Sequence, residues 1–343
     1  VGGLDINRNW PGQWQQEYIQ SGSGRYPLSE PETRAVAEFL FAHPNVTGLI
    51  NHHMAGNFVY RPPTAKHFDP VTGEEIPMSQ ADEAIFRFFG NKYSELINDQ
   101  EVRPVFGRGG PPRYGAIWGV MIGWAYDHYG VFSWVPEMGS FVPFADYDDD
   151  GEATEMERLR WNDTEMNGSV FVDWTPYDHP QLGQVEIGGF LRKTYDSSRR
   201  QYNNVMCTPG PVFEEFLQEH TDWNLWMASM SPYVQVTDVM AEDVESGFVK
   251  ITAKVQNQGY LPTNVTEQAI HTRMAKTVKV SISLEGAELV FGDETQDVGH
   301  LSGNRSEPVT VEWMIRRTGR GQPNVVVTAM SEKGGTDSHT LGG

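Results

Sequence analysis

The chain has 343 residues, of which 38% are hydrophobic and 21% charged, and its formal net charge at pH 7 is −20. This length predicts about two domains, and the negative charge argues against nucleic acid as a partner, because phosphate binding requires a surface rich in lysine and arginine. The single cysteine, Cys207, excludes an internal disulfide framework, and no apolar run reaches the roughly 18 residues that a membrane-spanning helix needs.

Helices and strands are predicted to alternate in the first part of the chain. Ser29 is expected to cap a helix, with Glu32 completing a capping box, and an apolar stripe follows at Ala35, Val36, Phe39 and Leu40. Further along, the pattern predicts a strand at 46–53, a helix at 79–100, a glycine- and proline-rich loop at 107–123 and a strand at 131–135. This alternation is typical of an α/β sheet, in which ligands gather at the C-terminal ends of the strands.

The second part of the chain has a different texture. Residues 141–206 are acidic and rich in turn formers, which predicts an irregular insertion, and a helix is expected at 211–230. Beyond residue 233, segments with period-2 alternation are separated by Gly, Asn and Pro, at 249–255, 277–284, 309–315 and 324–329. Such a series predicts a β-sandwich. We therefore expect an α/β domain over 1–232 and an all-β sandwich domain over 241–343.

Three widely separated parts of the sequence offer a cation, two imidazoles and a carboxylate. The forked guanidinium of Arg8 suits a free carboxylate, His52 and His53 end the strand at 46–53, and Glu137 follows the strand at 131–135. A carboxylate beside a metal-bound water acts as a general base. Because adjacent strand residues point to opposite faces, only one of the two histidines can face a metal.

Taken in order, Asp5–Trp10, Ser29–Thr33, His53 and Trp124–Glu137 resemble the zinc metallocarboxypeptidases of the M14 type. The resemblance implies a carboxypeptidase-like mixed sheet flanked by helices, and zinc-dependent hydrolysis of the C-terminal bond of peptide substrates. It also implies residue roles: Asn7 and Arg8 bind the terminal carboxylate, His53 rather than His52 is the third zinc ligand, and Glu137 is the general base.

Further roles follow from the same resemblance. Tyr114, in a Gly/Pro-rich stretch, corresponds to the mobile tyrosine that covers the substrate, and an ordinary loop tyrosine is the alternative. Ile122 falls at the floor of the specificity pocket, where an apolar side chain favours apolar or aromatic terminal residues. Pro136, directly before Glu137, departs from the family pattern, and a proline in a strand must sit where pairing stops.

One part of the family's site is missing from the sequence. The first two zinc ligands form a His-x-x-Glu motif upstream of the Asn-Arg pair, and no His-x-x-Glu occurs in this sequence. The first two ligands of the catalytic Zn²⁺ are therefore expected outside this chain, in an N-terminal part that completes the catalytic domain. On this basis either the natural protein is expected to be longer or a second polypeptide is expected to complete the domain.

A second metal site is indicated within the insertion. The segment Asp146–Glu157 fits the calcium-loop pattern D-x-D-x-D-G-x5-E. Hard oxygen ligands for a structural Ca²⁺ would come from Asp146, Asp148, Asp150, the Glu152 carbonyl and a bidentate Glu157. The alternative is a solvated acidic run.

The C-terminal tail does not decide between an enzyme and a binding protein. The stretch Val255–Thr263 resembles the CARDB-type adhesion sandwiches of extracellular bacterial enzymes. We expect a secreted or extracellular metallocarboxypeptidase. The alternatives are a catalytically inactive relative that acts as a binding or adhesion protein, and an amidohydrolase of the same fold acting on small acylamino acids.

Overall fold

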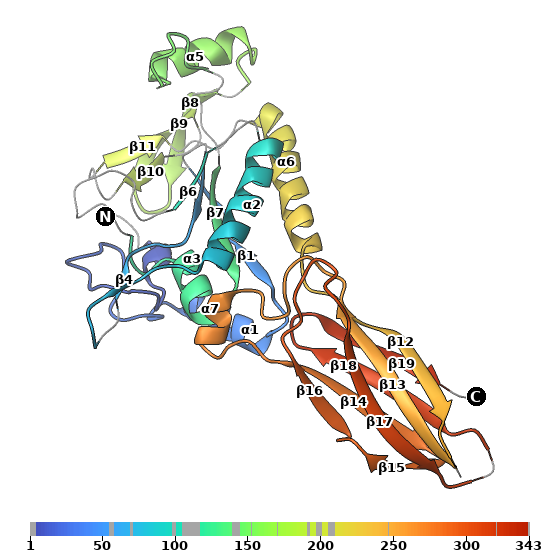
Figure 1. Cartoon of the computed structure of the whole chain (residues 1–343). Helices are drawn as coiled ribbons and strands as arrows, with labels where there is room; N and C mark the ends of the chain where they lie inside the picture. Colours follow the sequence, from blue (N-terminus) through green and yellow to red (C-terminus); the bar gives the residue numbers. More distant parts are fainter. Residues whose placement is uncertain are drawn as a thin grey trace.

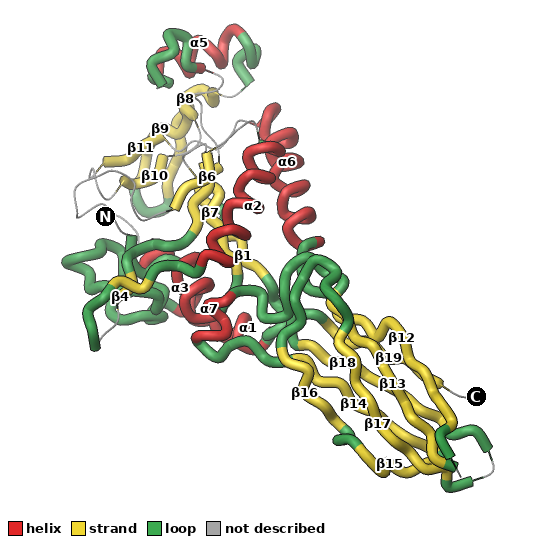
Figure 2. The backbone as a smooth tube through the Cα atoms, viewed as in Figure 1, coloured by secondary structure: helices red, strands yellow, loops and turns green. Residues whose placement is uncertain are grey.

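The computed structural model describes the chain except for residues 1–4, 55–57, 69–70, 98–100, 105–116, 139–144, 152, 170, 191–192, 197–200, 205–209, 246, 320 and 342–343. A part built of helices and a small sheet is followed by an elongated part made of strands (Figure 1; Figure 2). The predicted fold class is confirmed: a mixed α/β sheet flanked by helices precedes an all-β sandwich.

The mixed sheet has the strand order β1-β7-β3-β6, with β2 also paired to β7. Its strands are β1 (Gly48–Ile50), β2 (His53–Met54), β3 (Phe58–Arg61), β6 (Glu101–Pro104) and β7 (Phe132–Met138). β7 runs parallel to β1 and β2 and antiparallel to β3, which is parallel to β6. The single strand predicted at 46–53 is therefore two short strands laid end to end against β7.

Pro136 lies at the interruption between β1 and β2. β1 pairs with β7 as far as Trp134, and β2 resumes the pairing at Glu137. On the other side of β7, Pro136 stands opposite Val59 of β3. Proline has no N–H to donate to a ladder, so it fits where the neighbouring strand is broken.

The two faces of β7 have different neighbours. Phe132 and Trp134 pack against α2 (Gln80–Leu96), with ring centroids 4.9 and 5.2 Å from Phe86. Trp134 also meets Trp223 of α6 (Gly210–Ser229) at 5.6 Å. On the opposite face, the Ser133 hydroxyl donates to the Ile122 carbonyl, and Val135 packs with Tyr60, Val120 and Ile122. By the period of two, Glu137 shares this second face.

The capping box predicted at Ser29 is wrong. The helix α1 (Pro31–Ala42) begins after Glu30, which occupies the N-cap without a side-chain cap bond. Asn9 supplies the cap from the neighbouring loop instead, since its Oδ1 accepts from the Glu30 N–H at 3.1 Å and from the Thr33 hydroxyl at 2.8 Å. The apolar stripe is also only partly correct: the helix buries Thr33, Ala37 and Leu40, whereas Val36 and Phe39 are exposed.

Two segments expected to be irregular contain regular structure. The end of the loop predicted at 107–123 is already helical, as α3 (Met121–Trp124) continues into a π-helical turn, η3 (Ala125–Tyr129). The insertion carries α5 (Glu155–Thr164), the hairpin of β8 (Phe171–His179) and β9 (Gly183–Phe190), and the pair β10 (Lys193–Asp196) and β11 (Gln201–Asn204). Turn-forming residues here mark the hairpin connection rather than a lack of strands.

The sandwich consists of two four-stranded antiparallel sheets. One has the order β12-β13-β17-β15, from Val234–Asp243, Phe248–Asn257, Val309–Arg317 and Ala287–Phe291. The other has the order β16-β14-β18-β19, from Thr295–Gly299, Val278–Glu285, Asn324–Ser331 and Gly335–Leu341. Alternate residues of β13, β14, β17 and β18 form the core around Trp313. All four predicted strands are present, and each sheet has two more.

Short elements complete the description. They are η1 (Ile6–Arg8), the hairpin of β4 (His67–Phe68) and β5 (Glu75–Ile76), and α7 (Glu267–His271), which lies between two sandwich strands in the sequence but packs against η3 and α2. In the described part of the chain, no helix combines the length and apolarity required to cross a bilayer.

Candidate active site

The N-terminal loop holds Asn7 and Arg8 in a short helical turn. Asp5 caps η1, because its Oδ1 accepts from the Asn7 N–H at 3.1 Å. The Arg8 guanidinium lies 3.3 Å from Asp5 Oδ2 and donates to the Asn7 carbonyl at 2.7 Å. Gly119 allows the next loop to pass directly over this turn: its φ is +66°, and a Cβ there would lie 2.1 Å from the Arg8 carbonyl oxygen.

His53 and Glu137 stand side by side on neighbouring strands. They are register partners in the parallel pair β2–β7, and His53 Nδ1 lies 3.9 Å from Glu137 Oε1. Both side chains are partly buried, at 27% and 15% exposure. The break between β1 and β2 at Pro136 therefore brings an imidazole and a carboxylate together at the C-terminal end of the parallel strands.

Asn7 connects the N-terminal turn to His53. Its Oδ1 accepts from the Met121 N–H at 2.8 Å, and its Nδ2 lies 2.7 Å from His53 Nε2. Because the oxygen is already occupied by the Met121 N–H, the amide nitrogen is the atom that faces Nε2. Asn51 approaches the same Nε2 at 3.4 Å. No role was predicted for Asn51, although its position two residues before His53 in the predicted strand is a signal for a shared face.

The electrostatic surroundings keep His53 neutral. Burial lowers the pKa of His53 below its ordinary value, and the nearby Arg8 cation lowers it further, whereas Asp5 acts in the opposite direction. A neutral imidazole is the form that coordinates a metal ion. His52 points to the other face of the sheet, where its Nε2 lies 3.4 Å from Asn224 Nδ2 of α6 and its ring lies 6.3 Å from that of His220.

Ile122 lies in a small apolar cluster on the same face of the sheet as Glu137. It is 2% exposed and packs with Tyr60, Val120 and Val135, while Ile117 covers the cluster from one side. The structure thus places Asn7, His53, Glu137 and Ile122 on one side of the sheet. Tyr114, the predicted mobile tyrosine, lies outside the described residues.

At this site the described residues fit a zinc ion only in part. Catalytic zinc takes three protein ligands and an open position, and His53 is a suitable neutral nitrogen donor. Among the described residues, however, the one group of three or more potential ligands with converging atoms is acidic and lies elsewhere. Two ligands besides His53 are therefore required from residues that this part of the chain does not supply.

That acidic group is formed by Asp146, Asp148 and Glu157, whose ligand atoms all lie within 4.8 Å of one another. Asp146 accepts hydrogen bonds from the Asp150 and Gly151 N–H groups. Repulsion from neighbouring acids, Asp150 above all, raises the pKa of Asp148.

Glu157 is already engaged in local structure. It forms the capping box of α5 with Thr154 and accepts from the Tyr147 N–H. Glu152 lies outside the described residues. Calcium binding at this loop stays a prediction.

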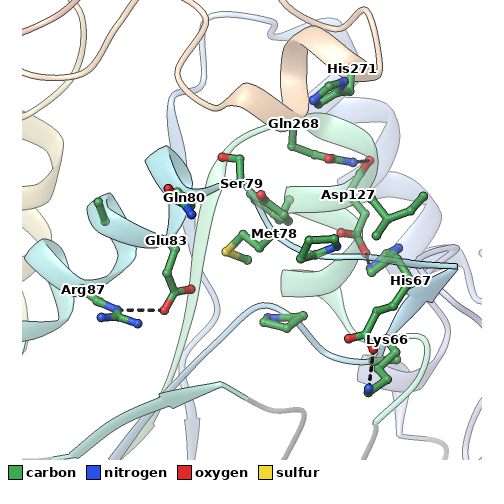
Figure 3. A pocket seen from close by; sticks show the side chains of 17 residues that line it. Lys66, His67, Met78, Ser79, Gln80, Glu83, Arg87, Asp127, Gln268 and His271 are labelled. Carbon is green, nitrogen blue, oxygen red and sulfur yellow. Dashed lines mark hydrogen bonds and ion pairs between the residues drawn. The ribbon is translucent and has the colours of Figure 1, made fainter. Parts of the chain in front are cut away.

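A large pocket of about 1,100 Å³ lies apart from this site (Figure 3). Its walls come from the β4–β5 hairpin, the first turns of α2, η3 and α7. His67 Nε2 lies 3.1 Å from Asp127 Oδ2 in the wall, and this contact raises the pKa of His67. Asp127 precedes β7, whereas Glu137 lies near the other end of that strand, so the pocket and the candidate active site lie at opposite ends of β7.

Comparison with known proteins separates the chain into two regions. Residues 1–150 match the family described as zinc carboxypeptidase (Peptidase_M14), and residues 233–342 match a domain of unknown function (DUF8731). Carboxypeptidase A5 from Homo sapiens is 28% identical over 134 residues, which make up 36% of this chain and 28% of that protein. Carboxypeptidase A5 from Macaca fascicularis gives the same figures. The chain thus spans only 28% of the length of these curated relatives.

Among solved structures, the chain is similar to the CARDB domain of a Pyrococcus furiosus protein. The sequence identity is 12% and the TM-score 0.21, over 32% of this chain and 92% of that one. It is also similar to the archaellum stator protein FlaG from Sulfolobus acidocaldarius, at 15% identity and a TM-score of 0.17.

Proposed function

We propose that this chain, whose residues 1–150 match the zinc carboxypeptidase family, is the catalytic part of a peptidase that removes C-terminal residues from peptides. The observation that supports this proposal most is the approach of His53 and Glu137 in one strand register, with Asn7 in contact with the imidazole. These groups come from three distant parts of the sequence. Their convergence is what a metal site with an adjacent general base requires.

The N-terminal turn would bind the substrate's free carboxylate. Arg8 has 20% of its side chain exposed, so its guanidinium remains accessible while Asp5 holds it in place. A guanidinium binds both oxygens of a carboxylate at once. Asn7 lies between this cation and His53, so the terminal carboxylate and the scissile bond would be held close to each other.

Zinc would be held by His53 together with two ligands from outside this chain. When bound, it polarises the scissile carbonyl and lowers the pKa of its water. Glu137 would take the proton of the attacking water and later give it to the leaving amine. Asn7 keeps the imidazole in position, because its own amide is fixed by the Met121 N–H.

The apolar cluster around Ile122 would select the terminal residue. A buried Ile122 beside Val120 and Val135 offers no partner for a charged side chain, so apolar and aromatic C-terminal residues should be preferred. We also propose that Tyr114 covers the bound substrate. A secreted or extracellular location stays a prediction.

The proposal is tested with a full-length form of the protein, assayed with and without added Zn²⁺. The substrates are a blocked dipeptide ending in phenylalanine, the same dipeptide ending in lysine, and an acyl-aspartate. Zinc-dependent hydrolysis of the phenylalanine peptide, with much slower cleavage of the lysine peptide, is expected. Preference for the acyl-aspartate would assign the protein to the amidohydrolases of this fold. Zinc binding without hydrolysis of any substrate would indicate a catalytically inactive binding protein.

A further inference from the structure

The sandwich contributes a segment to the core of the mixed-sheet part. Residues 258–276, between β13 and β14, leave the sandwich and pack against η3 and α2 (Figure 1). Leu261 and Val265 of this segment, at 3% and 1% exposure, belong to the same apolar cluster as Phe86, Tyr129 and Trp134. Residues that come after the first two sandwich strands in the sequence therefore complete the core of the mixed-sheet part.

A buried carboxylate holds this segment in place. Asp82, in the first turn of α2, is 2% exposed. It accepts from the Glu267 N–H at 2.9 Å, from the Gln268 N–H at 3.2 Å and from the Tyr126 hydroxyl at 2.8 Å. The first free N–H groups of α7 are thus capped by a residue 185 positions away in the sequence. Hydrogen bonds to a buried charged group are among the stronger ones in proteins.

Thr266 and Gln268 extend the contact to the start of β7. The Thr266 hydroxyl, fully buried, donates to the Gly130 carbonyl at 2.8 Å and accepts from the Ala269 N–H at 3.0 Å. The Gln268 side chain donates to the Asp127 carbonyl at 3.1 Å (Figure 3). Gly130 permits the approach, because its φ is +78° and a Cβ there would lie 2.6 Å from that of Ala269.

We propose that Asp82 and α7 form a latch that makes the mixed-sheet part and the sandwich one cooperative folding unit. The two family matches end at residue 150 and begin at residue 233, and neither implies this contact. The latch lies at the base of β7, the strand that carries Glu137 near its other end. The sandwich is on this account a structural component of the catalytic part, and the wall that α7 contributes to the large pocket is fixed by the same contacts.

Native-state hydrogen exchange of the full chain, followed by mass spectrometry in increasing urea, tests the proposal. Cooperative units exchange their most protected amides through a shared opening. The slowest amides of β7 and β13 should therefore show the same opening free energy and the same urea dependence. The wild-type protein alone can overturn the proposal. It would do so if the slowest amides of the two strands differed more than about tenfold in protection or responded differently to urea.

Variants of the latch make the test specific. Asp82→Asn should reduce protection of β7 and of β13 by the same factor, about 10- to 100-fold, since two N–H groups lose a charged acceptor. Asp238→Asn, which removes an exposed carboxylate 3.7 Å from Lys254 in the sandwich, is the matched control and should change protection by less than about threefold.

A second pair of variants covers the case in which Asp82→Asn does not fold. Thr266→Val removes the bond to Gly130, and Thr266→Ser restores a hydroxyl at nearly the same place. Loss of protection in both strands with Thr266→Val and recovery with Thr266→Ser supports the latch. Loss confined to either β7 or β13 would overturn it.

Discussion

Lys333 lies on the other side of the same junction, and its surroundings predict an unusual pH dependence of stability. It sits in the turn between β18 and β19, and its Nζ donates to the Val46 carbonyl at 2.7 Å and lies 4.6 Å from the centre of the Tyr129 ring. The side chain is 8% exposed. Burial lowers the pKa of Lys333 from 10.5 to about 8, although the neighbouring Glu332 acts in the opposite direction.

The direction of the pH dependence follows from the number of protons that the folded and unfolded states bind. Between about pH 8 and 10.5 the unfolded chain binds a proton on Lys333 that the folded protein has released, so the free energy of unfolding rises with pH in this window. At about 1.4 kcal/mol per pKa unit, the full gain is on the order of 3 kcal/mol. Below pH 8 both states are protonated and the contribution is constant.

The assay compares the wild-type protein with Lys333→Met by urea unfolding at several pH values from 7 to about 10.5. Groups that titrate equally in both proteins cancel in the difference. The stability of the wild type relative to the variant should increase by about 2–3 kcal/mol across the window. A difference that stays flat, or that falls as the pH rises, would refute the reasoning about this buried ammonium.

Three further predictions concern separate sites. Arg8→Ala should raise KM for peptides with a free C-terminal carboxylate by about 10- to 100-fold, and an unchanged KM would remove Arg8 from substrate binding. The contact with Asp127 raises the pKa of His67, so protonated His67 should stabilise the fold below pH 6.5, and this contribution should be lost as the pH rises through the folded-state pKa. In His67→Gln, the free energy of unfolding measured with urea should therefore change less with pH over this range. An identical pH dependence in both proteins would contradict this role of His67. Added Ca²⁺ should raise Tm in the wild type but not in Asp146→Asn, so a wild-type Tm that does not respond to Ca²⁺ would exclude the predicted loop site.

The part of the fold that depends on local periodicity could be read from the sequence. The strands at 249–255 and 309–315 alternate strictly, and in the structure their alternate residues, such as Ile251 and Trp313, form the sandwich core. The juxtaposition of His53 and Glu137 likewise follows from two strands that end at one edge of a parallel pair. The signals for these elements were the period of the apolar residues and the position of His53 and Glu137 at strand ends.

What could not be predicted depends on long-range partners. The apolar stripe predicted for α1 included Val36 and Phe39, but both are exposed, because only Leu40 of the stripe lies on the buried face, together with Thr33 and Ala37. The latch between Asp82 and α7 joins residues 185 positions apart and has no local signal. A helical or strand period identifies residues on one face, whereas tertiary contacts determine whether that face is covered.

The candidate site, too, contains contacts that the sequence could not predict. Asn7 was predicted to bind the substrate, and in the structure its amide is in addition fixed by the Met121 N–H and faces His53 Nε2. This contact depends on how the N-terminal turn and α3 meet, which no motif encodes. The roles of Asn7, Arg8, His53 and Glu137 stay predictions until they are measured.

The most direct test of the account is Glu137→Gln in the full-length protein, with kcat and bound zinc measured on the same preparation. The substitution keeps the size of the side chain and its place in β7 opposite His53. Loss of a general base should lower kcat by about 10²- to 10⁴-fold, while the zinc content per chain stays that of the wild type. A variant that retains kcat within about threefold of the wild type, with zinc still bound, would contradict the assignment of Glu137 and with it the proposed active site.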